Sequence, residues 1–408
     1  MEVLYERCAG LDVHKDSVVA CVRIAQQRDA TREVRSFETT TSGLLELSDW
    51  LQQHDCSHVA LEATGVYWKP VWHILEGNFE LLLANAAHIR NVPGRKTDVN
   101  DATWIADLLA HGLIRASFVP PAGIQEIRDL TRTRKQLVRE VAQHTLRIQK
   151  TLEDANIKLT GTISNVLGLS GRAILDALVA GETDPQRLAA LVHPGIRAPQ
   201  AKLVEALRGR VTAHHRFLLR LHLGQVDALR AAIAELDAQL GKALGEASRL
   251  AKLLTTMPGV GDIVAQVIVG EIGTDMTRFP SAAHLVSWAG LCPRSDESAG
   301  KRRSTRIRHG APWLKTALVQ AAWAAARKRE SYYRAQFLRL KGRRGPKKAI
   351  IAVAASMLTA AYHMLRDGTE HEDLGADHFD RRDRTHAAKR LTRRLEQLGF
   401  SVELRPAA

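Results

Sequence analysis

Residues 9–25 read AGLDVHKDSVVACVRIA, which is an apolar strand pattern, a short polar turn and a second strand pattern. Two further strand patterns, HVALEATG at 58–65 and ELLLANA at 80–86, each end in small or polar residues. Apolar residues recur at helical spacing in 42–54 and in 65–77. Strands that alternate with helices predict an α/β layer fold for residues 1–120.

The remainder of the chain reads as helical. A strongly charged helix pattern covers 124–159, and a second long helix is predicted over roughly 200–250. In that second helix an a/d seam predicts helix pairing, either within the chain or between chains, and its members are Val226, Leu229, Ile233, Leu236 and Leu240. We therefore predict a helical coiled-coil region at 121–250, a third domain at 251–368, and a polar tail or late helix at 369–408.

The composition favours a polyanionic partner. The 408 residues include 58 Lys and Arg against 44 Asp and Glu, a formal net charge of +14. Such a balance suits phosphate-rich ligands, although charge alone does not distinguish nucleic acid from an anionic membrane. The sequence shows no run of the ~20 apolar residues that a membrane span needs and no signal peptide, which favours a cytoplasmic protein without a membrane partner. The four scattered cysteines predict small buried side chains, with neither a zinc site nor a disulfide framework.

Four carboxylates in the first 120 residues have positions suited to a metal site. Asp12 lies where the first strand meets its turn, and Glu62 ends the strand HVALE. Asp98 and Asp101 share one face of a predicted helix because they are three residues apart. Magnesium prefers hard oxygen ligands, and a two-metal phosphoryl-transfer site needs several carboxylates close together. Taken singly, Asp98 could instead be a helix N-cap and Asp12 a turn residue.

Several motifs of the later chain predict contacts with phosphates. The stretch MPGVGDIVAQVIVGEIG at 257–273 has the cadence of a helix-hairpin-helix, in which Gly259 and Gly261 permit a close turn with amides facing a phosphate. The stretch AGLCPRSDESAGKRRSTRIRHG at 289–310 places Ser298 in a small Ser-Ala-Gly turn. Basic residues that we expect to bind nucleic acid are Lys301, Arg302, Arg303, Arg306 and Arg308 after that serine, Arg132, Arg134 and Lys135 in the charged helix, and the later run Lys341, Arg343, Arg344, Lys347 and Lys348.

With GLDVHKD, LEATG, KTDVNDA, PGVG and GLCPRSDESAGK in this order, the chain resembles the DEDD transposases of the insertion sequence 110 family, which are guided by a bridge RNA. The resemblance implies a RuvC-like domain of the ribonuclease-H fold, a coiled coil, and a transposase domain with a nucleophilic serine. It implies that the magnesium-binding carboxylates are Asp12, Glu62, Asp98 and Asp101, and that the nucleophile is Ser298. It further implies donor and target double-stranded DNA, a non-coding guide RNA, and dimers that assemble into a tetramer.

Alternative interpretations remain at this stage. Ser295 and Ser304 are rival nucleophiles, and Ala299 stands where the family often has glycine. A Holliday-junction resolvase-like nuclease would use metal-activated water at the carboxylates and would not need Ser298. A DNA- or RNA-binding protein with an inactive acidic site would use only the basic surfaces.

Overall fold

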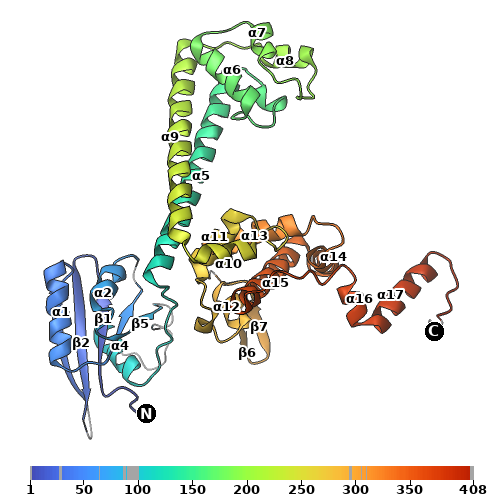
Figure 1. The fold of residues 1–408 in the computed structure, drawn as a ribbon. Helices are drawn as coiled ribbons and strands as arrows, with labels where there is room; N and C mark the ends of the chain where they lie inside the picture. Colours follow the sequence, from blue (N-terminus) through green and yellow to red (C-terminus); the bar gives the residue numbers. More distant parts are fainter. Residues whose placement is uncertain are drawn as a thin grey trace. The chain divides into compact units, whose positions relative to one another are not determined.

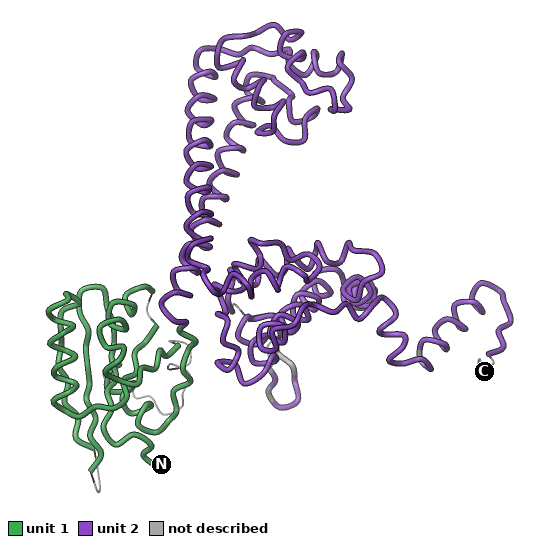
Figure 2. The backbone as a smooth tube through the Cα atoms, viewed as in Figure 1, with its two compact units in different colours: residues 1–119 green, residues 120–408 purple. Residues whose placement is uncertain are grey.

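The computed structural model of the chain describes residues 2–26, 30–63, 65–85, 89, 101–293, 296–304, 306–308 and 310–404. It divides into two compact units, Met1–Val119 and Pro120–Ala408, which Figure 2 distinguishes by colour. Each unit has its own buried core, and each is described by itself below.

Unit 1 contains a five-stranded mixed sheet with the strand order β3-β2-β1-β4-β5. Its strands are β1 (Arg7–Val13), β2 (Ser17–Ala25), β3 (Ala30–Glu38), β4 (His58–Glu62) and β5 (Glu80–Ala84). The first three strands pair antiparallel, whereas β1 with β4 and β4 with β5 pair parallel. The sequence patterns predict every strand of this sheet except β3, whose side chains are mostly exposed.

Helices cover both faces of this sheet. The helices α1 (Thr41–Gln53) and α2 (Trp68–Leu75) bury Leu47 and Leu75 against Leu11 and Leu61 of the strands. The helix α4 (Asp101–Ala110) packs on the opposite face, where Ile105 joins Cys8 and Ala60. Strand residues therefore alternate between the two helical layers, and this alternation fixes the face on which each carboxylate lies.

A long helical hairpin opens unit 2 (Figure 1). The helices α5 (Ala122–Asp154) and α9 (Ala213–Leu244) pack along each other. Between them lie the short helices η1 (Leu159–Gly161), α6 (Leu169–Ala180), α7 (Pro185–Ala190) and α8 (Gln200–Ala206). The seam that begins at Val226 and ends at Leu240 lies on α9, so α9 finds a helical partner within the same chain.

The prediction of one continuous helix over 200–250 is wrong. The chain leaves helical geometry after α8, and α9 begins at Thr212, whose side chain accepts from the backbone of His215 in a capping box. The helix α9 ends at Gly245, which has a positive φ of 43°, and α10 (Ala247–Leu254) follows. Local capping at both ends divides the apolar pattern into three helices.

The later part of unit 2 is built around α15 (Pro346–Asp367), which contacts α12 (Ala282–Trp288), α13 (Pro312–Ala325) and α14 (Tyr332–Arg344). The other elements of this part are α11 (Asp262–Ile272), η2 (Met276–Arg278), β6 (Asp296–Ser298), β7 (Lys301–Ser304), α16 (His378–Arg382) and α17 (Arg384–Gln397). Among the described residues, α15 alone is long and apolar enough to span a membrane, but 56% of its apolar window is buried in the protein. Packing in the core accounts for its composition.

The cysteine prediction is confirmed for three of the four residues. Cys8, Cys21 and Cys56 are buried, and burial raises the pKa of the Cys8 and Cys56 thiols to about 12. They are protonated side chains of the core at neutral pH, whereas Cys292 is half-buried.

Candidate active site

Strand register places two of the predicted carboxylates beside each other. The parallel pair of β1 and β4 aligns Leu11 with Leu61, and Asp12 and Glu62 are the next residue on each strand. Equivalent positions on adjacent parallel strands project from the same face of a sheet. Asp12 and Glu62 therefore share the face opposite to that of the buried Leu11 and Leu61.

Asp101 lies over the same face. A Cβ at Gly10 would collide with the backbone of Ala102 and Ala106, so α4 packs directly on β1 at this glycine. Gly10 and Asp12 are two residues apart and project from one face, and Asp101 is the first residue of α4. The helix thus brings the Asp101 carboxylate toward Asp12.

The electrostatics of Asp12 agree with this arrangement. Burial raises the pKa of the Asp12 carboxyl, and the charge of Asp101 raises it further, while His14 opposes both effects. The Nε2 atom of His14 lies 3.3 Å from Oδ2 of Asp12. His14 was not among the predicted site residues, although its place two residues after Asp12 in GLDVHKD offered the signal.

These carboxylates supply oxygen ligands of the kind that hard divalent cations prefer. In the part of the chain that the structure describes, no group of three or more His, Cys, Asp or Glu side chains is already arranged to hold a metal ion. The fourth predicted carboxylate, Asp98, lies outside the described residues.

Ser298 lies at the tip of a β-hairpin, which we call the serine hairpin and define as β6, β7 and the turn between them. It is the last residue of β6 and pairs with Lys301 across a two-residue turn. Ala299 has a φ of 49° and Gly300 a φ of 73°. Positive φ at both central positions is the geometry of the tight I′ hairpin turn. The small turn predicted from the sequence is therefore a tight reversal with a left-handed alanine.

The two rival serines have different positions. Ser304 ends β7, and its hydroxyl accepts a hydrogen bond of 3.2 Å from the backbone N–H of Arg306. Ser295 lies outside the described residues. Of the predicted basic residues, Lys301, Arg306 and Arg308 are exposed, and Arg302 and Arg303 belong to β7. The hairpin is further held by Lys315, whose Nζ donates to the carbonyl of Arg308 at 2.9 Å.

The two glycines of the PGVG turn have different surroundings. Gly259 has a φ of 83°, and a Cβ there would collide with the backbone of Ala321 and Ala325 in α13. Gly261 is the N-cap of α11 and has open space around its Cα. Gly259 thus serves the packing of helices, whereas only Gly261 has room for a ligand beside its backbone.

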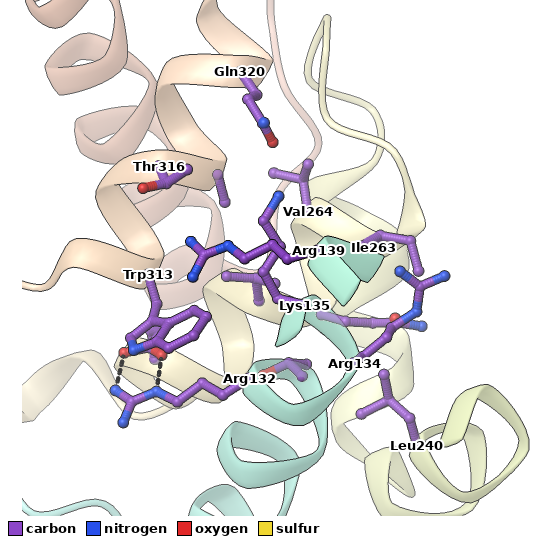
Figure 3. A pocket seen from close by; sticks show the side chains of 15 residues that line it. Arg132, Arg134, Lys135, Arg139, Leu240, Ile263, Val264, Trp313, Thr316 and Gln320 are labelled. Atoms are coloured by element: carbon purple, nitrogen blue, oxygen red, sulfur yellow. Dashed lines mark hydrogen bonds and ion pairs between the residues drawn. The ribbon is translucent and has the colours of Figure 1, made fainter. Parts of the chain in front are cut away.

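Two of the predicted nucleic-acid-binding arginines form ion pairs inside unit 2. Arg132 donates to both oxygens of Glu271 at 2.8 and 2.9 Å, contacts that Figure 3 draws as dashed lines from Arg132. Glu271 is only 1% exposed. Arg134 donates to Asp237 at 2.5 and 3.1 Å. These pairs join α5 to α11 and α9. Arg132 and Arg134 therefore act in packing, and the role in nucleic-acid binding stays a prediction for them.

An aromatic ring lies among the same cations. The guanidinium carbons of Arg132 and Arg139 lie 5.8 and 5.1 Å from the centre of the Trp313 ring. Together with Arg132, Arg139 and Trp313, Lys135 lines a pocket of unit 2 (Figure 3). Glu271 was not predicted to pair with these arginines, although a lone acid in the apolar run VIVGEIG needs a partner when it is buried.

Two family models match the chain. One, described as a transposase of the DEDD type of IS110, matches residues 9–157. The other, described as the transposase IS116/IS110/IS902 family, matches residues 251–337. The first match includes all four predicted carboxylates, and the second includes the serine hairpin.

Curated relatives extend over different parts of the chain. The "Insertion element IS110 uncharacterized 43.6 kDa protein" of Streptomyces coelicolor is 38% identical over 141 residues, which is 34% of each chain. The "Pilin gene-inverting protein" of Moraxella bovis is 23% identical over 88% of this chain and 95% of its own. The "Putative transposase y4pF/y4sB" of Sinorhizobium fredii is 29% identical over 41% of this chain and 46% of its own.

Proposed function

This chain belongs to the insertion sequence 110 family of transposases, and we propose that it cuts and rejoins donor and target DNA through a covalent bond to Ser298. Transposase and DNA recombinase activity are the function of the family as its models and relatives describe it. The nucleophile, the metal and the guide RNA are the parts that we propose here.

The observations that support the proposal are that strand register puts Asp12 beside Glu62 and that the charge of Asp101 acts on Asp12. Three acidic groups in separate strands and a helix repel one another, and burial makes the charged form of Asp12 more costly still. A cation bound at Asp12 would offset the cost that burial and the charge of Asp101 place on its ionised form. Carboxylate oxygens are also the donors that a divalent metal such as Mg²⁺ prefers.

We assign the metal ligands to Asp12, Glu62, Asp101 and, from the family motif, Asp98. Bound Mg²⁺ would polarise the scissile phosphodiester and stabilise negative charge on its oxygens. The protein's own part is to hold the carboxylates in place, and His14 favours the ionised form of Asp12 against the effect of burial. The register of β1 and β4 sets Asp12 beside Glu62. The close contact of Gly10 with α4 sets how near to the sheet Asp101 lies.

In the proposed step, the Oγ atom of Ser298 attacks the phosphorus of a DNA phosphodiester. A bond forms between Oγ and phosphorus, and the bond between phosphorus and the oxygen of the leaving strand breaks. The hydroxyl proton of Ser298 passes to that leaving oxygen, so the strand ends in a hydroxyl group. The number of phosphoester bonds is unchanged, which lets the reverse reaction join the strand to another duplex without further energy.

The cations of the serine hairpin support the same role. Lys301 pairs with Ser298 at the tip of the hairpin, Arg306 and Arg308 lie at its base, and all three cations are exposed. Such side chains bind the phosphate backbone without reading its sequence. We propose a bridge RNA as the source of sequence recognition, and the net charge of +14 supports a second nucleic-acid partner beside DNA.

We also propose that the protein assembles into dimers and tetramers. The helix α9 packs along α5, and of the seam residues Val226 and Leu240 are buried while Leu229, Ile233 and Leu236 are half-buried. Exposed apolar side chains on the two helices supply a surface for assembly, and they include Leu146 at 57%, Phe217 at 53% and Leu221 at 47% exposure. The mixed sheet between helical layers is compatible with the ribonuclease-H fold that we propose for unit 1.

The decisive experiment compares Ser298→Ala with Ser304→Ala on DNA that carries donor and target sites. Covalent protein–DNA adducts are separated on a denaturing gel, and the attached residue is identified by mass spectrometry. We expect Ser298→Ala to form no adduct and Ser304→Ala to form it normally. A Ser298→Ala protein that still cuts DNA and leaves free phosphate ends would instead support a resolvase-like nuclease that uses water.

The guide is tested separately by sequencing RNA that elutes with the protein purified from its host. A single abundant non-coding species is the expected result. Purification without RNA would contradict the guided mechanism and leave the Ser298 chemistry standing.

A further inference from the structure

A groove of about 680 Å³ lies at the base of the serine hairpin, within unit 2. The bridge between Pro293 and Ile307, which joins the segments entering and leaving the hairpin, forms one side of it. The end of α14 and the first turns of α15 form the other side, where Ile351 lies. Four cations line this groove, and they are Arg306, Arg344, Lys347 and Lys348.

Among the described residues that line the groove, none is acidic. Within the described ranges, none of these four cations forms an ion pair, in contrast to Arg132 and Arg134 on α5. Four like charges around one hollow repel one another unless an anion lies between them. The groove therefore has the electrostatic character of an anion site.

The position of two of the cations strengthens this interpretation. Lys347 and Lys348 lie in the first turn of α15, and that turn contains no acidic residue. The positive end of a helix disfavours cations there by about 0.3–1 kcal/mol each. Arg344 lies in the last turn of α14, where the dipole favours it, so it needs no ligand to explain it. Lys347 and Lys348 do need a ligand to explain them, because cations at the positive end of a helix lower the stability of the free protein.

The apolar lining indicates the form of the ligand. Ile307 and Ile351 lie in the groove together with Leu291, and 37% of Ile307 is exposed. A base-paired duplex would bring its phosphates to the cations but would leave this apolar surface in water. An unpaired nucleotide can place its base on the apolar lining and its flanking phosphates on the cations. A volume of about 680 Å³ also falls in the ordinary range of ligand pockets.

We infer that this groove binds an unpaired nucleotide of a nucleic-acid strand, together with the phosphates on either side of it, next to the serine hairpin. The inference rests on the proposed function only in taking nucleic acid as the ligand, and it does not require Ser298 to be the nucleophile. The described lining residues include no aromatic ring, so the base would be held by apolar contact without selection of its identity.

The test measures binding of the full chain in a Ser298→Ala background, which separates binding from cleavage. Lys347→Gln with Lys348→Gln is compared with Lys341→Gln with Arg343→Gln, a pair of the same charge change on α14 that does not line the groove. The probes are one fluorescent 20-mer DNA strand, the RNA strand of the same sequence, and the blunt DNA duplex.

We expect the groove variant to lose about tenfold in affinity for the single strand and less than about threefold for the duplex. The slope of log affinity against log salt should fall by about 0.7 for each phosphate that the variant no longer neutralises. The control pair should change both affinities equally. Ile307→Ser should weaken single-strand binding without changing the salt slope. Preference for the DNA or for the RNA probe identifies which strand supplies the nucleotide.

Equal losses for strand and duplex in the groove variant would overturn the inference, because the cations would then act as a diffuse basic surface. A loss of single-strand affinity in the control pair that is as large and as selective as in the groove variant would overturn it too. Unchanged binding by the groove variant would overturn it as well. The adduct experiment is independent of all these results, because a groove variant with Ser298 restored can still be examined for covalent attachment to DNA.

Discussion

The carboxylates of unit 1 and the serine hairpin of unit 2 are held in opposite ways. Asp12 and Glu62 are fixed by the register of a buried sheet, and Asp101 by a helix that touches the sheet backbone. Ser298 stands on a short hairpin with exposed cations, held mainly by its own turn. The acidic region is a rigid scaffold with unfavourable charge, and the basic region is an exposed element with a strained turn. Each would gain counter-charge from its proposed ligand.

The largest effect is expected from Asp12→Asn, which removes one charge from the acidic region. We expect the rate of strand cleavage to fall on the order of 10⁴-fold, as losses in a catalytic constellation do. The metal-free protein should be as stable as the original or more stable, because repulsion with Asp101 is relieved. Cleavage assays and thermal unfolding in a chelator test both parts. Asp16→Asn is the control, and an active Asp12→Asn protein would contradict the site.

Gly10→Ala tests whether close backbone contact holds Asp101 in place. The added Cβ would meet the backbone of α4, and relieving the clash should cost about 1–3 kcal/mol. Amide hydrogen exchange should show faster opening of α4. Gly123→Ala in α5 is the matched control, because a Cβ there meets nothing within 4 Å and should leave stability equal or higher. Unchanged protection of α4 would mean that the contact is not what fixes the carboxylate.

Ala299→Gly tests the strain in the serine hairpin. An alanine at a φ of 49° costs about 1 kcal/mol relative to glycine, so the variant should stabilise the hairpin by about that amount. Exchange of the β7 amides should slow. Ala322→Gly, in the interior of α13, should lower stability by about 1 kcal/mol instead. A hairpin that exchanges faster in Ala299→Gly would contradict the turn geometry.

The smallest effect is a dependence of stability on pH. The folded-state pKa of Asp12 is raised, so the folded chain binds this proton more tightly than the unfolded chain does. Its contribution to stability is therefore present below the unfolded value near 3.8 and is lost as pH rises through the higher folded value. Metal-free unfolding measured against pH should show this loss in the original protein. Asp12→Asn should remove it, and an identical pH profile in both proteins would contradict the burial of Asp12.

Much of the fold is readable in the sequence wherever a local pattern is complete. The strands that contain Asp12 and Glu62 are predicted by apolar runs that end in small or polar residues, and the long charged helix is predicted by its helical spacing. The edge strand β3 escaped prediction because its solvated side chains lack a buried face. The division of 200–250 into separate helices escaped because caps at Thr212 and Gly245 interrupt an otherwise continuous apolar pattern.

The candidate site shows the same limit in its charged residues. The sequence singled out Arg132 and Arg134 for their charge, yet each reaches an acid more than 100 positions later in the chain. In the sequence, the cations of the groove look the same as those two arginines, because both sets are basic residues in charged stretches. Only the distant acids, Glu271 and Asp237, separate the paired set from the unpaired one.

The sequence by itself determined the residue types: the acids at strand and helix ends, the serine before a basic run, and the family to which the chain belongs. The tertiary structure decided which of those charges meet. Strand register set Asp12 beside Glu62. The absence of a side chain at Gly10 allows α4 to pack against β1. Acidic residues on distant helices form ion pairs with Arg132 and Arg134. The physical reason is that electrostatic energy depends on distance and burial in space, which spacing along the chain does not specify.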